Sequence, residues 1–196
     1  MNILKTNIEG LLVIEPGVHE DGRGYFYESF NLDKFNNATG LDFNPVQDNE
    51  SMSCFGVIRG LHYQKPPFAQ AKLVRVVQGE VIDVAVDMRP ESVTFGQYVA
   101  VTLNDVNKRQ FFIPKGFVHG FAVLSEEAIF QYKCDEYYHP EAEGGVSYKI
   151  INWQAITNNK IKPEDFIISP KDEAREKVNS PEELLELAKE VYGDKD

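Results

Sequence analysis

The sequence predicts an all-β protein, a jelly roll (double-stranded β-helix) with only minor helices. Between Leu11 and about Cys134, short runs rich in valine, isoleucine, phenylalanine and tyrosine are separated by glycine, proline, asparagine and aspartate. Such spacing is typical of sandwiches and barrels. The expected strands are 11–14, 25–30, 57–64, 72–77, 81–87, 97–103, 110–113, 117–124 and 128–133. Nine short antiparallel strands favour a jelly roll.

Local sequence signals also place turns and helices. Gln78-Gly79 has the length and the glycine of a tight hairpin, which would join two neighbouring antiparallel strands. A helical turn is expected over residues 32–38. Ser180-Pro181-Glu182-Glu183 supplies a capping oxygen, a proline at the first helical position and a capping-box glutamate. Apolar residues then recur at helical spacing up to Val191, and Gly193 is placed to end this helix in a left-handed conformation.

The length of 196 residues suits one domain with a sizeable core. We interpret residues 1–196 as a single domain, with residues 173–196 as a C-terminal helical tail. No internal repeat, P-loop or Gly-x-Gly-x-x-Gly motif is present.

The net charge of −11 argues against a protein that binds nucleic acid or an anionic membrane, because either role needs a positive field over much of the surface. An anionic ligand would need a local basic pocket. The two cysteines, Cys54 and Cys134, form neither a Cys-x-x-Cys pair nor a disulfide framework. Lys5 and Glu9 interrupt the first apolar residues, so no signal peptide is recognised. We therefore expect a cytoplasmic protein.

Two histidines lie on expected strands. Strand alternation puts His62 and Gln64 on one face, and His119 on a face with Phe121 and Val123. A lone strand histidine is more often a hydrogen-bonded core residue than a functional one. Two histidines in one barrel make a functional site more plausible.

Pro114-Lys115-Gly116-Phe117-Val118-His119 has the Pro-x-Gly-x-x-His pattern of the second half of a cupin motif. A cupin metal site also needs a His-x-His pair and a carboxylate in the first half, but here Gln64 follows His62. An amide oxygen binds a borderline transition metal poorly. We therefore expect a cupin-type fold without a metal, and a metal site built from His62, Gln64 and His119 is the alternative.

Two further side chains are unusual for their strands. Lys72 precedes two valines on one strand face, where a cation is costly unless it meets an anion. Tyr132 shares a face with Phe130 and Cys134, where its hydroxyl should seek a polar partner. Both also have structural interpretations, because Lys72 could reach solvent at a strand end and Tyr132 could be a core aromatic.

Six segments together resemble the dTDP-4-dehydrorhamnose 3,5-epimerase family. They are Asp21-Gly22-Arg23-Gly24-Tyr25-Phe26, Val46-Gln47-Asp48-Asn49, Arg59-Gly60-Leu61-His62-Tyr63-Gln64, Lys72-Leu73-Val74-Arg75-Val76, Ile113 to Phe121, and Ser169-Pro170-Lys171-Asp172. The match covers roughly Leu11 to Asp172 in family order and near-family spacing. After Glu143 the chain is shorter than the family pattern and keeps only Trp153.

The resemblance implies a homodimeric cupin jelly roll without a cofactor. It would convert dTDP-4-dehydro-6-deoxy-D-glucose to dTDP-4-dehydro-L-rhamnose in dTDP-rhamnose biosynthesis. His62 matches the family's base, Tyr132 the proposed acid, Asp172 the carboxylate that orients His62, and Lys72 the cation near the C4 oxygen. Residues matching substrate contacts are Arg23, Glu28, Gln47, Asp48, Asn49, Arg59, His119, Tyr138, Glu143 and Lys171. Arg23 and Arg59 are the expected diphosphate contacts, and guanidinium groups suit that role.

Other functions remain open at the level of sequence. A relative could epimerise only one carbon, or move the ketone between C3 and C4. A metal-dependent cupin enzyme and a non-catalytic sugar-nucleotide binding module are further alternatives. The pairing of His62 with Tyr132 favours the double epimerisation.

Overall fold

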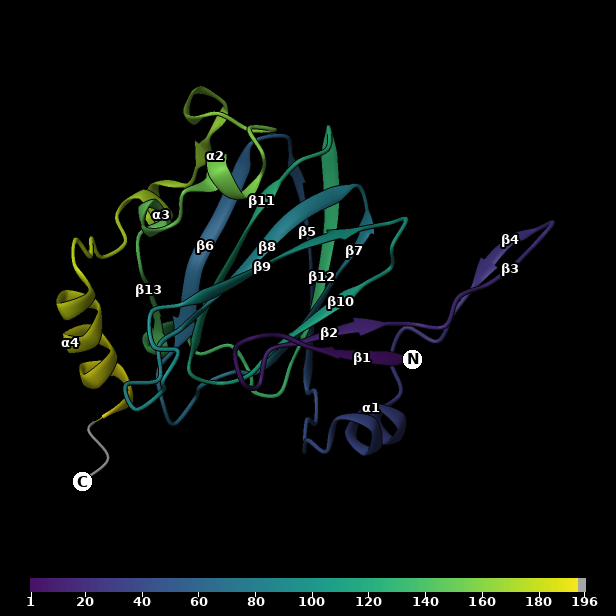
Figure 1. Cartoon of the computed structure of the whole chain (residues 1–196), viewed down its shortest axis with the longest axis horizontal. Coiled ribbons are helices and arrows are strands. Elements are labelled where there is room, and N and C mark those ends of the chain that lie inside the picture. The colour runs from purple at the N-terminus through teal and green to yellow at the C-terminus, as the bar shows by residue number, and fades with distance from the viewer. Residues whose placement is uncertain (194–196) are drawn as a thin grey trace.

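Two facing β-sheets form the body of the molecule in the computed structural model, which describes residues 1–193 (Figure 1). In spatial order, one sheet contains β1 (Asn2–Lys5), β2 (Leu12–Glu15), β10 (Gln110–Ile113), β7 (Lys72–Gln78), β12 (Glu127–Cys134) and β5 (Gln47–Cys54). The other contains β13 (Glu143–Gly145), β6 (Val57–Gln64), β11 (Phe117–Val123), β8 (Glu80–Asp87) and β9 (Tyr98–Asn104), and β14 (Ile167–Ile168) pairs parallel with β6. The predicted all-β jelly roll is confirmed.

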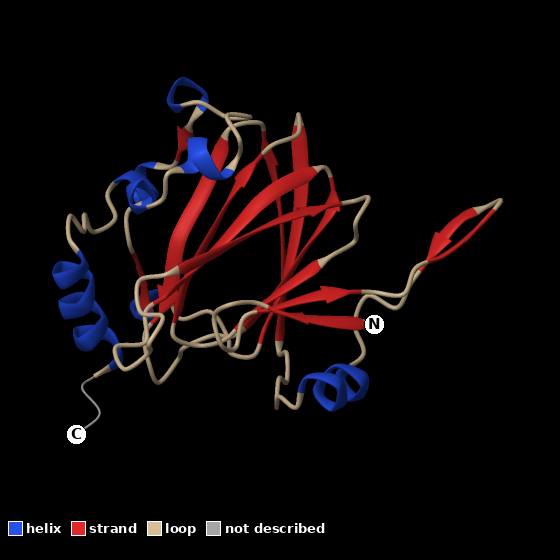
Figure 2. Cartoon of the chain, viewed as in Figure 1, coloured by secondary structure: helices blue, strands red, loops and turns tan. Residues whose placement is uncertain are grey.

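Helices lie outside the two sheets, as Figure 2 shows. They are α1 (Leu32–Thr39), α2 (Trp153–Ile156), α3 (Pro170–Glu173) and α4 (Pro181–Tyr192), with the 3₁₀ turns Pro140–Ala142, Tyr148–Ile150 and Pro163–Asp165. The helical turn expected over residues 32–38 is confirmed as α1. Among the described residues, no helix is long and apolar enough to cross a membrane.

The buried apolar side chains form three clusters, and strand alternation divides those of β8 between two of them. On β8, Val81 and Ala85 face the space between the sheets, whereas Ile82 and Val84 pack on the outer face of the second sheet. Because other side chains cover both faces of β8, its sequence is an almost continuous run of apolar residues. Asp83 shares the inner face with Val81 and Ala85, so its carboxylate lies inside the barrel with no exposed surface.

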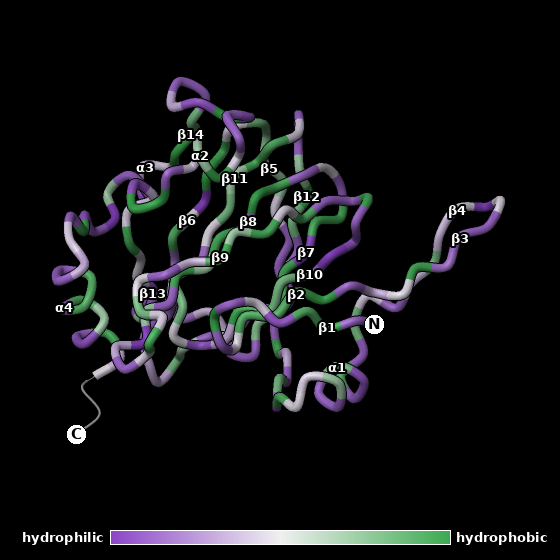
Figure 3. The backbone as a smooth tube through the Cα atoms, in the orientation of Figure 1, coloured by the Kyte–Doolittle hydropathy of each residue, from purple (hydrophilic) through white to green (hydrophobic). Residues whose placement is uncertain are grey.

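Helix α4 covers the outer face of the second sheet. Its buried residues, Leu184, Leu187, Ala188 and Val191, join the same cluster as Ile82 and Val84, and Figure 3 shows α4 alternating between hydrophobic and hydrophilic residues. The Ser180 side chain accepts a hydrogen bond from the Glu183 backbone, as predicted. The Glu183 carboxylate bonds to Asn179 instead of closing a capping box on Ser180. This packing makes the helix part of the folded body.

Three further local expectations are wrong. Gly79 adopts a φ of +82°, but the turn at Gln78-Gly79 carries the chain from one sheet to the other, so β7 and β8 are not paired neighbours. The strand expected over residues 25–30 ends at Phe26. Gly193 has a φ of 76° with a ψ of 151°, outside the left-handed helical region.

Strands β3 (His19–Asp21) and β4 (Gly24–Phe26) form a hairpin that extends away from the two sheets (Figure 1). All six residues in these strands are exposed, including the aromatic rings of Tyr25 and Phe26. Exposed aromatic residues on a projecting ribbon are typical of a surface that contacts another molecule.

Candidate active site

A cavity of about 400 Å³ opens at one end of the barrel. Its lining comes from both sheets, from the loops before β7 and before β13, and from the chain after β13. It comprises Gln47, Asn49, Arg59, His62, Tyr63, Gln64, Gln70, Lys72, Tyr132, Tyr138, Glu143, Ser169, Lys171 and Asp172. The cavity therefore collects all four expected catalytic residues and six of the ten expected binding residues.

A β-bulge in β6 aims two functional side chains into this cavity. Where β6 pairs with β11, His62 lies opposite His119 and Arg59 lies opposite Phe121. Three residues along β6 therefore span the same length as two residues along β11. Without the bulge, residues three apart would face opposite sides of the sheet. Gly60 has a φ of +121°, and an added Cβ would lie 2.7 Å from the Gly120 Cα. Glycine is therefore required at this position.

His62 is held by a carboxylate from a distant segment. Ser169 caps the short helix α3, and its side chain accepts a hydrogen bond from the Asp172 backbone. The Asp172 Oδ1 then lies 2.6 Å from the His62 Nε2. Burial alone would raise the pKa of Asp172, but the hydrogen bond and charge of His62, with hydrogen bonds from Gly60 and Ser169, lower it. Asp172 can therefore orient the His62 imidazole and stabilise its protonated form.

Lys72 and Tyr132 lie together on the opposite sheet. The Lys72 Nζ is 5.7 Å from the centre of the Tyr132 ring. Burial lowers the pKa of Lys72, against the attraction of Cys134, Asp83 and Glu143, and burial raises the pKa of the Tyr132 phenol. The tyrosine thus keeps its proton at neutral pH, as a general acid requires.

Asp83 and His119 form a second, buried pair in the barrel. The His119 Nε2 lies 2.9 Å from both carboxylate oxygens of Asp83, and burial raises the pKa of Asp83 despite His119 and Lys72. His119 does not line the cavity, although it is directly opposite His62 in the strand register. Sequence reasoning missed Asp83, because the apolar run Val81–Val86 gave no reason to single it out.

The side-chain amide of Gln64 is hydrogen-bonded to backbone groups at both its nitrogen and its oxygen. Its amide nitrogen donates to the carbonyl oxygens of Phe68 at 2.5 Å and Tyr137 at 3.0 Å, and its oxygen accepts from the His139 backbone at 2.8 Å. These bonds fix the loop that carries Tyr138. Within residues 1–193, no three His, Cys, Asp or Glu side chains gather as a metal-binding set. In the alternative metal site of His62, Gln64 and His119, the Gln64 side chain is not free to act as a ligand, because its amide is already bonded to backbone groups.

The rim of the cavity is a cluster of charges around Glu143. Its Oε2 accepts hydrogen bonds from Lys171 at 2.7 Å and from the Tyr138 hydroxyl at 2.5 Å, and its Oε1 accepts from Arg175. Burial would raise the pKa of Glu143, but these hydrogen bonds and the charge of Arg175 lower it to about 2. Arg175 was not singled out from the sequence, because it follows the recognised motif.

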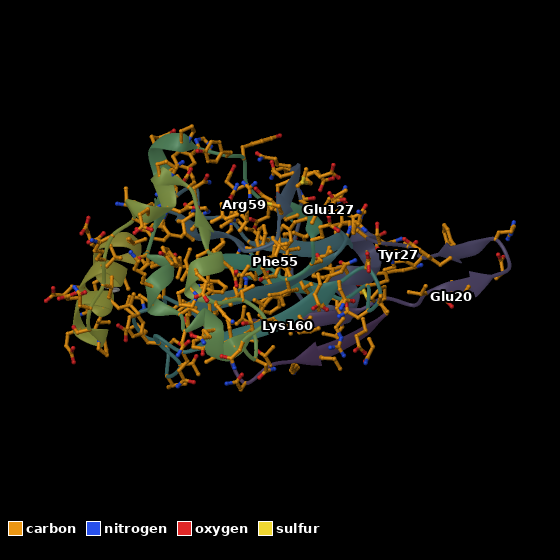
Figure 4. The ribbon with its side chains drawn as sticks, turned by 90° about the horizontal axis from the view of Figure 1, so that it is seen from above. Glu20, Tyr27, Phe55, Arg59, Glu127 and Lys160 are labelled. Atoms are coloured by element: carbon orange, nitrogen blue, oxygen red, sulfur yellow. The ribbon has the colours of Figure 1, made fainter. Side chains whose placement is uncertain are left out.

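Besides His119, three expected binding residues lie away from this cavity. Asp48 alternates with Gln47 and Asn49 along β5, so its side chain points to the other face of the sheet. There its carboxylate pairs with Lys133 on the outer face. Arg23 lies in the turn between β3 and β4 and bonds only to Asp21 among the described residues. Glu28 pairs with Lys34 on α1. Figure 4 shows the separation: Arg59 lies over the body, whereas Glu20 marks the projecting hairpin.

A family model described as dTDP-4-dehydrorhamnose 3,5-epimerase matches residues 5–180. The chain belongs to this family. The predicted resemblance is thereby confirmed over a longer stretch than the six segments cover.

Named relatives support the same assignment. The dTDP-4-dehydrorhamnose 3,5-epimerase of Escherichia coli K12 is 48% identical over 187 residues, covering 95% of this chain and 98% of that protein. The crystal structure of dTDP-6-deoxy-D-glucose-3,5-epimerase from Legionella pneumophila Philadelphia 1, in complex with dTDP-4-keto-L-rhamnose, is 50% identical. It superimposes with a TM-score of 0.82 and covers 90% of this chain and 92% of that one. A dTDP-4-dehydrorhamnose 3-epimerase of Streptomyces niveus is 38% identical over 74% of this chain and 70% of that protein.

Proposed function

We propose that this chain is an isomerase that converts dTDP-4-dehydro-6-deoxy-D-glucose to dTDP-4-dehydro-L-rhamnose by epimerisation at C3 and C5. The observation that carries the proposal is the meeting, in one cavity, of His62 held by Asp172 with Tyr132 and Lys72. These groups match the three needs of the reaction, which are a base, an acid and a cation for the intermediate.

The chemistry follows from the ketone at C4. Removal of the proton from C3 or C5 leaves an enolate whose negative charge rests on the C4 oxygen. Returning a proton to the opposite face of that carbon inverts it and regenerates the ketone, so no atom is gained or lost. His62 takes the proton, and Tyr132 returns one from the other side. Exchange with solvent then removes the proton from His62 and restores one to Tyr132 before the next inversion. Imidazole suits this role because it titrates near neutral pH.

Lys72 acts on the charge that develops during the reaction. A cation fixed in a partly buried site stabilises the enolate oxygen more than the neutral ketone, and therefore lowers the barrier. Val74 and Val76, on the same face of β7 as Lys72, pack in the core between the sheets, and Lys72 lines the cavity beyond them. Lys72 should affect turnover more than substrate binding.

The nucleotide part of the substrate has its own groups in this proposal. Arg59 donates to the Ser53 hydroxyl at 2.9 Å and to the Met52 carbonyl oxygen, which presents its guanidinium at the cavity edge for a diphosphate. Gln47, Asn49, Tyr138, Glu143 and Lys171 are the further proposed contacts, with Tyr138 stacking on the base. His119 lies opposite His62 in the strand register and does not line the cavity, so it would act only indirectly on the substrate.

We also propose a homodimer in which the hairpin serves the partner's site. Arg23 and Glu28 match the family's substrate contacts, yet neither lies at this chain's own cavity. The projecting hairpin and the outer edge of β5 are complementary features, because β5 has no further strand beside it within residues 1–193 and a free strand edge readily accepts one. Arg23 and Glu28 would then complete a site in trans.

The remaining expectations are proposed with this function. The reaction needs no cofactor, because the substrate's own ketone acidifies both carbons. Residues 1–196 would act as one domain, since α4 packs into the same apolar cluster as the second sheet. The cytoplasm is the proposed location, in line with the free thiols of Cys54 and Cys134.

Product analysis tests the function. The purified protein should convert the 4-keto sugar nucleotide to the L-rhamno product, identified by its proton couplings in nuclear magnetic resonance (NMR) spectra, and a folded His62→Ala variant should not. A product inverted only at C3 would favour the single-carbon alternative, which the Streptomyces niveus relative represents. Migration of the ketone to C3 would identify a keto-isomerase, and loss of activity on chelation would identify a metal-dependent enzyme.

A further inference from the structure

Arg175 lies between two carboxylates that line the cavity, Glu143 and Asp172. One of its guanidinium nitrogens donates to the Glu143 Oε1 at the rim, and its Nε lies 3.8 Å from the Asp172 Oδ1. That oxygen is the one that contacts His62. The Arg175 side chain is only 12% exposed, so solvent screens its charge weakly.

The fold makes room for this side chain and holds it. Gly145 pairs with His62 across β13 and β6, and an added Cβ there would lie 3.1 Å from both Cδ and Nε of Arg175. The backbone beside Arg175 is tied down, because its N–H bonds to the Asp172 carbonyl and the Glu176 carbonyl accepts from Ser147. These contacts fix the backbone from which the Arg175 side chain extends towards Glu143 and Asp172.

The Nε of Arg175 is buried and has no hydrogen-bond partner within residues 1–193. Buried donors of this kind need an explanation. At 3.8 Å it is beyond hydrogen-bonding distance from Asp172. The guanidinium consequently acts on Asp172 through its charge and not through a direct bond.

We propose that Arg175 is a positioning residue that tunes the proton preference of the His62–Asp172 pair. The inference rests on the proposed function only for its kinetic consequence. Arg175 already neutralises part of the Asp172 charge, so that carboxylate stabilises the protonated form of His62 less. Like charges also repel, which further disfavours the imidazolium. The cation thus keeps His62 available as a base at lower pH.

Other charged groups around the pair are not themselves substituted when Arg175 is changed. They are Arg59 on β6, Lys72 on β7, His119 on β11 with its partner Asp83, Tyr132 on β12, Glu143 on β13 and Lys171 on α3. Among them, Glu143 keeps two donors, Lys171 and Tyr138, after loss of the arginine. A neutral variant at position 175 therefore isolates one charge.

The test compares Arg175→Gln with Arg175→Lys, and uses Arg175→Met as a second neutral variant in case the first does not fold. The matched control is Lys149→Gln, which removes a surface cation paired with Glu173 on α3. The His62 ring is followed by NMR across the pH range in the protein without substrate. Each variant's unfolding midpoint is measured alongside.

In the neutral variants, the His62 ring titration should move to higher pH by about one unit. The acidic limb of kcat/KM should move with it, which lowers kcat/KM about tenfold on that limb. Arg175→Lys and Lys149→Gln should titrate like the parent. If the neutral variants lose only stability and titrate like the parent, Arg175 is a structural brace and the inference is wrong. Because the ring titration needs no substrate, its result is independent of the proposed function.

Discussion

The Nε2 of His62 lies 2.6 Å from the Oδ1 of Asp172, although 110 residues separate them in sequence. A strand supplies the imidazole, and a four-residue helix capped by Ser169 supplies the carboxylate. The short contact means that Asp172 fixes the ring orientation as well as its preferred tautomer.

Asp172→Asn should keep the fold and lower kcat by on the order of 10²–10⁴. An amide cannot stabilise the imidazolium, and it can hold the ring in the wrong tautomer. Steady-state kinetics on the 4-keto sugar nucleotide would measure the loss. Glu173→Gln is the matched control, because Glu173 is the next residue on α3 but pairs with Lys149 outside the cavity. Equal activity in Asp172→Asn and the control would remove Asp172 from the mechanism.

Lys72→Met should lower kcat by about 10²–10³ while changing KM much less. The pH profile gives a second test. Burial lowers the pKa of Lys72 below its ordinary value of 10.5, so the cation is present at low pH and is lost as the pH rises through that lowered pKa. Turnover in the parent should fall along this alkaline limb, and Lys72→Arg should lack that limb because arginine keeps its charge. Lys133→Arg, on the outer face, should not alter it.

Glu143 should make stability depend on pH in acid. Its pKa is lowered from 4.5 to about 2 in the folded chain. Its contribution to the free energy of unfolding is therefore present above about pH 4.5 and is lost as the pH falls towards about 2. Urea unfolding at several pH values should show a flatter acid dependence for Glu143→Gln than for the parent. The exposed Glu186→Gln on α4 is the control and should follow the parent.

Mixed subunits should reveal whether Arg23 acts across a dimer. Arg23→Ala and His62→Ala should each be nearly inactive. If Arg23 serves the partner, a heterodimer of the two variants contains one site with both residues intact, and mixing after partial unfolding and refolding should restore activity. Activity that stays at the level of the separate variants would contradict a role in trans.

Most central strands could be predicted, because their apolar residues are periodic and their ends carry turn residues. β5 could not, since Gln47 and Asn49 face a polar cavity while Asp48 faces outward, and no apolar alternation remains. The turn at Gly79 was recognised, but a local sequence pattern does not say which sheet the next strand joins.

The site shows a similar limit. Alternation placed His62 and Gln64 together, but the bulge at Gly60 that adds Arg59 to their side depends on the neighbouring strand. Arg175 escaped notice because its two carboxylate partners come from β13 and α3. Spatial pairs of this kind arise from tertiary packing and leave no spacing pattern.

Deuterium exchange at each carbon tests the central claim most directly. The protein is incubated with dTDP-4-dehydro-6-deoxy-D-glucose in deuterium oxide, and NMR follows the protons on C3 and C5 together with the product stereochemistry. The account predicts that both positions exchange and invert in the parent, and that neither exchanges in His62→Ala. Exchange at only one carbon in the parent, or undiminished exchange in His62→Ala, would contradict it.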